Sequence, residues 1–247
     1  MSVKSISITD IGRQRQMNQD YVFTSEVPVG VLPNLFMVAD GMGGYKAGEF
    51  ASKSTIDTIV SEVMLSAEKR PIRVLTDAIS VANKKIRQKS MADDNYKGMG
   101  TTLVLSYFDG SSLCVANVGD SRLYLINDHI KQITTDHSLV EEMIRMGGLE
   151  RAKARTHPDK NVITRAVGVV DKVDVDFFEV CDVSNGDIVL MCSDGLTNMV
   201  EDSVIEQIVK GEGSIEYKAE RLIAEANNNG GRDNIAVILV QLFLDDK

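Results

Sequence analysis

The sequence is poor in the residues on which several common kinds of site depend. Among 247 residues it has three cysteines, three histidines, four prolines and no tryptophan. The cysteines (Cys114, Cys181 and Cys192) are odd in number and match no zinc-ligand spacing, which favours free thiols in a reducing compartment. Three histidines are also too few to predict a metal site built on imidazole ligands.

Long hydrophobic runs are missing as well. The longest, such as 35–39 and 235–240, have five to six residues, whereas a membrane-spanning helix needs roughly 20. The first ten residues lack the apolar core of a secretory signal. We therefore expect a cytoplasmic protein.

Positive charge is in deficit. The 27 lysines and arginines stand against 36 acidic residues, a net charge of −9. Nonspecific binding to nucleic acid or to a membrane surface needs basic patches, so we expect neither as a partner. The 43% hydrophobic and 26% charged residues are typical of a globular chain. No repeat or proline-rich linker divides it, which favours a single domain over 1–247.

Apolar patterning predicts a mixed fold. Alternating or continuous apolar residues predict strands, and apolar residues three to four apart predict helices. The expected strands are 3–9, 35–39, 101–108, 113–118, 121–126, 173–180, 187–192 and 235–243, and the expected helices are 47–67, 72–86, 139–144 and 215–226. Because strands do not alternate regularly with helices, two antiparallel sheets with helices outside are favoured. The three close strands within 101–126 are typical of an antiparallel meander.

One segment fits no regular element. Residues 147–161 are polar and basic without a clear period, which predicts a loop or flap between ordered elements. Its four cations form either a solvated face or a surface that meets substrate; they are Arg151, Lys153, Arg155 and Lys160.

Several aspartates lie beside predicted strands, among them Asp40, Asp120, Asp194 and Asp233. Each alone is a typical turn former or helix cap. If the strand ends converge on one edge, however, the gathered carboxylates repel one another unless they bind cations. Oxygen ligands suit magnesium or manganese, and two such ions point to hydrolysis of a phosphate ester. Arg15 could bind the phosphate through its guanidinium group.

Seven short motifs follow one another across nearly the whole chain. They are DIGRQRQMNQD (10–20), VADGMGG (38–44), GMGTT (98–102), VGDSR (118–122), DHS (136–138), CSDGLT (192–197) and GRDN (231–234). Together they resemble the bacterial type 2C, metal-dependent Ser/Thr protein phosphatases. This resemblance implies an α+β fold, a four-layer α-β-β-α sandwich of two antiparallel β-sheets flanked by helices, with a flap subdomain at about 145–165.

The resemblance also implies metal ligands. Asp40 would bridge two ions, and the carbonyl of Gly41 would bind one of them. Asp194 and Asp233 would hold the other ion. Asp120, together with Asp194, would contribute to a third site. The implied cofactors are two to three Mn²⁺ or Mg²⁺ ions per chain.

The same resemblance implies the remaining roles. Asp20 would lie in the metal shell, with water as the possible intermediary, and Arg15 would bind the substrate phosphate. Arg15, Asp40, Asp194 and Asp233 would be the catalytic residues. Metal-bridging water would attack phosphorus directly, without a phosphoenzyme. In agreement, no cysteine has an arginine six residues later, as a cysteine-based phosphatase requires.

Four positions qualify these roles. Gln19 stands where many relatives carry glutamate, which removes one negative charge from that side of the site. Met42 stands where eukaryotic members of the family have a histidine. The resemblance implies that this histidine protonates the leaving group there, which methionine cannot do. His137 is an alternative acid but is more typical of a structural hydrogen-bonding residue. Ser193 is more typical of a turn residue than of a nucleophile.

Three functions remain open from the sequence. The first is an active phosphoserine/phosphothreonine protein phosphatase, whose partners would be phosphorylated proteins and a cognate bacterial Ser/Thr kinase with its substrates. The second is a pseudophosphatase or regulatory binding module on the same fold. The third is a small-molecule phosphoesterase. The resemblance further implies a monomer.

Overall fold

The computed structural model describes residues 2–44, 46–181 and 183–243, and two antiparallel sheets form its centre. The first sheet has the strand order β1-β11-β10-β7-β8. Its strands are β1 (Ser2–Asp10), β11 (Ile235–Phe243), β10 (Ile188–Cys192), β7 (Arg122–Ile126) and β8 (Ile130–Gln132). The second has the order β2-β3-β5-β6-β9, and the short β4 also pairs with β3. Its strands are β2 (Asp20–Ser25), β3 (Leu35–Met42), β4 (Gly100–Thr101), β5 (Leu103–Asp109), β6 (Ser112–Val118) and β9 (Asp176–Val180).

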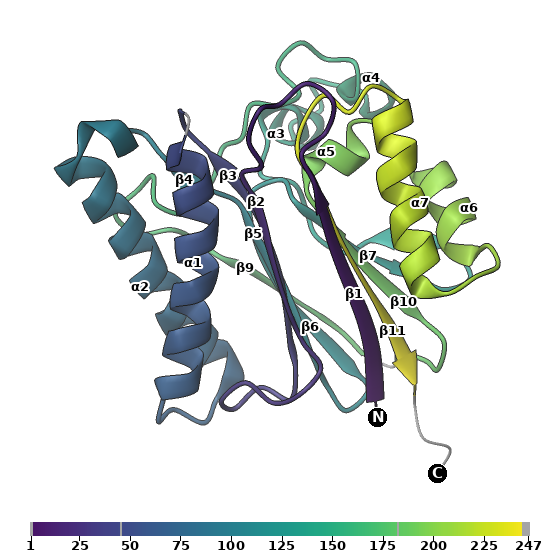
Figure 1. Cartoon of the computed structure of the whole chain (residues 1–247), viewed down its shortest axis with the longest axis horizontal. Helices are drawn as coiled ribbons and strands as arrows, with labels where there is room; N and C mark the ends of the chain where they lie inside the picture. Colours follow the sequence, from purple (N-terminus) through teal and green to yellow (C-terminus); the bar gives the residue numbers. More distant parts are fainter. Residues whose placement is uncertain (1, 45, 182, 244–247) are drawn as a thin grey trace.

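Two pairs of helices cover the outer faces of the sheets, so the predicted α-β-β-α sandwich is confirmed (Figure 1). Helices α1 (Lys46–Leu65) and α2 (Pro71–Ala92) lie against the second sheet. Helices α6 (Asp202–Lys210) and α7 (Ile215–Asn228) lie against the first. The shorter helices are η1 (Asp94–Tyr96), α3 (Leu139–Arg145), α4 (Arg151–Ala154) and α5 (Asp194–Thr197). No helix of the described chain combines the length and apolarity needed to cross a bilayer.

Strand β3 shows why its apolar run is continuous. Leu35, Met37 and Ala39 pack in the cluster beneath α1 and α2, whereas Phe36 and Val38 pack between the two sheets. Successive side chains of a strand point to opposite faces, and here both faces are buried. Because neither face of β3 is exposed to solvent, its sequence lacks the alternation of polar and apolar residues that a strand with one exposed face would show.

The predicted meander over 101–126 is wrong in its third strand. β5 and β6 form the expected antiparallel hairpin, but β7 pairs with β10 and β8 in the other sheet. The chain passes from one sheet to the other at Gly119. Its φ of +109° is readily adopted by glycine and is strained for other residues. This crossover places Asp120 between the two sheets.

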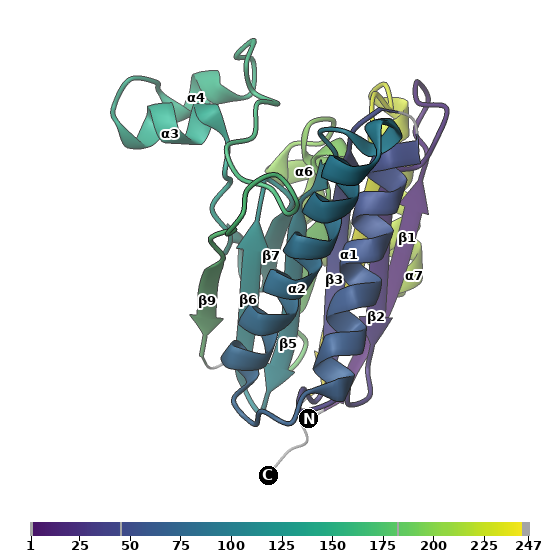
Figure 2. The same ribbon diagram turned by 90° about the vertical axis from the view of Figure 1, so that its left-hand side faces the viewer.

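Two strands and one longer helix were not predicted. Strand β2 has only partly buried residues after Asp20, and β8 has three residues, so neither carries a strong apolar pattern. Helix α6 does carry one, because Val204, Ile205, Ile208 and Val209 recur at helical spacing. Figure 2 shows α3, α4 and the segment after them standing beyond the sandwich, where the flap was expected.

Candidate active site

The predicted site residues meet at one end of the sandwich. A cavity of about 280 Å³ is lined by Arg15, Asp40, Gly41, Asp120, Asp194 and Asp233. They come from strand β3, the β6–β7 crossover, the start of α5, and the turns that flank β1 and β11. Asp20 is 6% exposed and stands opposite Asp40 in the β2–β3 register. The strand ends thus converge as the pattern of aspartates suggested.

Two threonines and a glycine fix the backbone around Asp40. The Thr102 hydroxyl accepts a hydrogen bond from the Asp40 N–H at 3.0 Å, and the Thr101 hydroxyl donates to the Asp40 carbonyl at 2.9 Å. A Cβ atom at Gly41 would collide with the carbonyl oxygen of Gly48. Glycine is therefore required where α1 passes close to β3.

Asp194 and Asp233 are held by different partners. Asp194 begins α5, and its Oδ2 accepts a hydrogen bond from Asn198 Nδ2 at 2.8 Å. Asp233 Oδ2 forms a 2.7 Å ion pair with Arg15, and its Oδ1 accepts from the Asn234 N–H. Arg15 is half exposed and lines the cavity, where a phosphate could bind.

The electrostatics of the cluster favour protons or cations. Burial, reinforced by the charges of Asp20, Asp194, Asp120 and Asp233, raises the pKa of Asp40 well above its usual range. Burial is also the main cause that raises the pKa of Asp20 to about 7, of Asp194 to about 6 and of Asp120 well above its usual range. Carboxyl groups that resist ionisation in this way become carboxylates readily once a bound cation compensates their charge.

Two buried oxygens test whether the site suits a divalent ion. Asp20 Oδ1 and Asp194 Oδ1 are buried and have no hydrogen-bond partner, which is costly for a polar atom unless something binds it. Across the described residues, no three or more His, Cys, Asp or Glu side chains are arranged as a complete metal site. Hard divalent ions retain water and use one or two carboxylates with carbonyl oxygens. The donors present, carboxylates and the Gly41 carbonyl, fit such ions.

Several candidate residues have structural partners instead. His137 Nδ1 accepts the Gly119 N–H at 2.9 Å, and its Nε2 lies 3.0 Å from Asp176 Oδ2, so both ring nitrogens are engaged. Ser193 donates to Asp20 Oδ2 at 2.7 Å and accepts the Ala236 N–H at 2.9 Å. These contacts fit the structural interpretations of both residues. Gln19 and Met42, in contrast, line the cavity.

The flap reaches the cavity through its last residues. Asn161 and Ile163 line the same cavity as the aspartates. Sequence reasoning missed Asn198, which touches Asp194, and the amide of Asn234, which ties the loop before β2 to β11 by donating to the carbonyls of Ile11 and Met17. The one signal for Asn198 was its position four residues after Asp194, on the same side of a helix.

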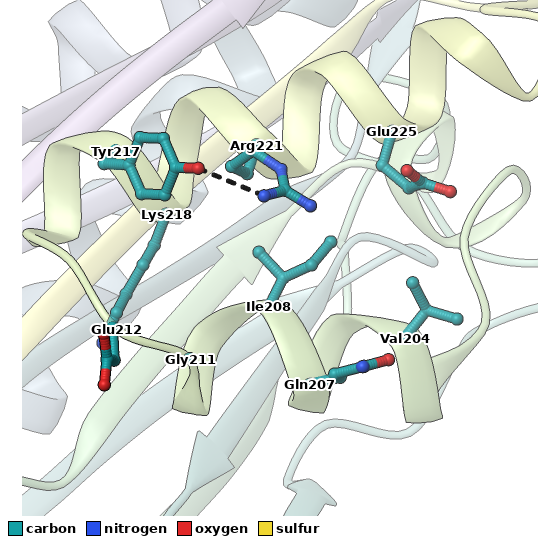
Figure 3. A pocket seen from close by; sticks show the side chains of 9 residues that line it. All are labelled: Val204, Gln207, Ile208, Gly211, Glu212, Tyr217, Lys218, Arg221 and Glu225. Atoms are coloured by element: carbon teal, nitrogen blue, oxygen red, sulfur yellow. Dashed lines mark hydrogen bonds between the residues drawn. The ribbon is translucent and has the colours of Figure 1, made fainter.

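A larger cavity, of about 550 Å³, lies between α6 and α7 (Figure 3). Ile208 and Val204 line it from α6, and Tyr217, whose hydroxyl lies 3.2 Å from Arg221 Nη1, lines it from α7. None of the predicted site residues lines this cavity. The chemistry therefore belongs to the smaller, acidic cavity.

Comparison with known proteins agrees with this geometry. Residues 29–235 match the family described as protein phosphatase 2C. The serine/threonine phosphatase stp of Listeria monocytogenes is 41% identical, and the match covers 97% of this chain and 96% of that protein. The crystal structure of the serine/threonine phosphatase Stp1 from Staphylococcus aureus has a TM-score of 0.90 and 34% identity, covering 98% and 96% of the two chains.

A second solved structure bears on the metal. It is the catalytic domain of the serine threonine protein phosphatase PstP in complex with two manganese ions, with a TM-score of 0.84 and 29% identity over 98% of this chain and 99% of that one. Fold, acidic cavity and family match thus agree. The chain belongs to the protein phosphatase 2C family and is a metal-dependent serine/threonine protein phosphatase.

Proposed function

We propose that the acidic cavity holds two to three Mn²⁺ or Mg²⁺ ions and is the phosphatase active site. The ligands would be Asp40, the carbonyl of Gly41, Asp194 and Asp233, with Asp120 at a third position and Asp20 acting through water. The observation that carries this proposal is the pair of buried oxygens without partners, Asp20 Oδ1 and Asp194 Oδ1. When bound, the ions would lower the pKa of a water molecule and neutralise the phosphoryl oxygens.

The remaining residues would bind and orient the substrate. Arg15 offers a guanidinium group for the phosphate, and its ion pair with Asp233 at 2.7 Å holds it at the cavity. Asn161 and Ile163 of the flap also line the cavity and would contact the substrate. His137 would supply no proton to the leaving group, because both its nitrogens bond elsewhere.

Phosphorylated proteins are the substrates that a protein phosphatase implies. We further propose a cognate bacterial Ser/Thr kinase and its targets as the physiological context, a monomer as the working form, and one catalytic domain over 1–247 with a flap at about 145–165. The relatives that support this context are themselves described as serine/threonine phosphatases.

The function can be tested with a panel of phosphorylated substrates. With added manganese, we expect hydrolysis of phosphoserine and phosphothreonine peptides, and of p-nitrophenyl phosphate, and we expect a chelator to stop all of it because the ions supply the nucleophile. Released phosphate is measured for each substrate, with phosphotyrosine peptides and small phosphate esters as comparison. Pure protein without manganese-dependent turnover would instead support a binding module, and faster turnover of small esters than of peptides would support a small-molecule phosphoesterase.

Arg15→Ala is expected to raise KM by about 10- to 100-fold, because a hydrogen bond to a charged group contributes about 1.5–3 kcal/mol. The guanidinium group would bind phosphate in the ground and transition states alike, so kcat should change less. Arg13→Ala is the matched control, since Arg13 belongs to the same loop and does not line the cavity. A collapsed kcat with an unchanged KM would contradict this role for Arg15.

A further inference from the structure

We propose that Asn198 is a positioning residue for Asp194, and that Lys160 of the flap fixes Asn198 in the required orientation. Lys160 Nζ donates to Asn198 Oδ1 at 3.0 Å, and Asn198 Nδ2 donates to Asp194 Oδ2 at 2.8 Å. The flap would thereby influence a carboxylate at the centre of the site. This inference rests on the proposed role of Asp194 as a metal ligand.

The residue types at the three positions determine the direction of the chain of hydrogen bonds. An ammonium group can only donate, and an ionised carboxylate can only accept. Asn198 lies between them with one acceptor and one donor group, so a single orientation of its amide satisfies both neighbours. An aspartate at 198 could accept from Lys160 but could not donate to Asp194, and an apolar residue could do neither.

The hydrogen bond also selects which oxygen of Asp194 remains available. Oδ2 is engaged by Asn198, whereas Oδ1 is buried without a partner. A side chain held through one oxygen presents the other in a fixed direction, as the outer partners of metal ligands do in general. The N–H of Asn198 also donates to the Asp194 carbonyl at 2.7 Å, so the two residues form one small rigid unit at α5.

A second flap cation anchors the same unit. Arg155 donates to the carbonyl of Thr197 at 2.7 Å and forms a 2.7 Å ion pair with Glu201. In the part of the chain that the structure describes, no carboxylate lies within ion-pair distance of Lys160 Nζ, which donates its side-chain hydrogen bond to Asn198 Oδ1. The charge of Asp194 still acts on it. Burial and the nearby charge of Arg155 lower the pKa of Lys160. A partly buried cation that is linked to Asp194 through the Asn198 amide, and not by a direct ion pair, fits a role in positioning that amide.

The first test measures Mn²⁺ affinity by isothermal titration calorimetry on the whole protein, without substrate. Asn198→Ala is expected to weaken binding by about 10- to 100-fold, the usual effect of losing an outer partner of a metal ligand. Asp194→Asn tests the underlying site. If Asp194→Asn binds Mn²⁺ as tightly as the wild type, the proposed metal role of Asp194 is wrong. If Asp194→Asn weakens Mn²⁺ binding but Asn198→Ala does not, only the inference about Asn198 is wrong.

The second test asks whether Lys160 acts through Asn198. Lys160→Met removes the hydrogen bond but also a positive charge near the ions, so its effect is measured both in the wild type and in Asn198→Ala. The effect of Lys160→Met is the ratio of the Mn²⁺ affinity before the substitution to that after it. We expect this ratio to be at least about threefold larger in the wild-type background than in the Asn198→Ala background. Equal effects in both backgrounds would overturn the coupling. Lys153→Met, which removes an exposed flap charge paired with Glu150, should leave affinity unchanged in either background.

Hydrogen exchange gives a readout that does not depend on metal binding. If the flap is docked through Lys160 and Asn198, amides of residues 148–160 should exchange faster in Lys160→Met and in Asn198→Ala than in Lys153→Met. Unchanged exchange in the first two variants would contradict the docking. An unaltered thermal midpoint of unfolding would show that each variant is folded.

Discussion

Asp194→Asn is expected to lower manganese-dependent turnover by about 10²- to 10³-fold, the effect of removing one preorganised electrostatic group from an active site. Asparagine keeps the size of the side chain and an oxygen for the bond from Asn198. It removes a negative charge that acts on Asp40, where it helps to raise the pKa of that carboxyl group. The loss should therefore appear in kcat/KM for phosphopeptides and, separately, in Mn²⁺ affinity.

Loss of folding does not explain such a result. Burial and the charge of Asp233 raise the pKa of Asp194 to about 6, so a neutral amide relieves repulsion in the metal-free protein. Its thermal midpoint should be equal to or above that of the wild type. Asp77→Asn, on the exposed face of α2, removes the same charge far from the cavity and should retain full activity. Turnover near the wild-type value in Asp194→Asn would mean that the metal assignment is wrong.

The fold class could be predicted because each layer of the sandwich requires its own local pattern of apolar residues. Strands with two buried faces, such as β3 and β11, appear as continuous apolar runs, and helices with one buried face appear as apolar residues three to four apart. The change from one sheet to the other after β6 produces no such pattern in the sequence. Short turns join both the strands of a hairpin and strands that lie in two different sheets. The crossover is seen only in the pairing of β7 with β10 and β8.

The candidate site was predictable for a related reason. Aspartates next to apolar runs lie at strand ends, and the ordered motifs specified which of them to choose. The contact between Lys160 and Asn198 could not be found in this way, because it depends on how the flap lies against α5. A polar residue in a loop has many possible partners, and its role depends on long-range geometry that local patterns do not encode.

The metal-free protein is expected to lose stability as the pH rises from about 5 to 7.5. The pKa of Asp20 is raised from 3.8 to about 7 and that of Asp194 to about 6, chiefly by burial. Between the unfolded value and these folded values, the folded state binds more protons than the unfolded state. The free energy of unfolding therefore falls as the pH rises through this window. Groups whose pKa is lowered, such as Asp176, titrate below their ordinary values, so their stabilisation is fully present above about pH 5 and does not change across this window.

Each unit of pKa shift corresponds to about 1.4 kcal/mol, so the cluster should change stability by a few kcal/mol and the thermal midpoint by on the order of 10 °C. Calorimetric midpoints at pH 5 and pH 7.5, each with chelator and with excess Mn²⁺, measure this. Manganese should abolish the decline, because bound cations stabilise the ionised carboxylates that are otherwise costly at high pH. Asp20→Asn should flatten the decline without metal, since it removes a group that titrates near pH 7. A metal-free midpoint that is constant or rises between these pH values would contradict the electrostatic description of the site, because buried carboxyl groups with raised pKa can only lower stability as they ionise.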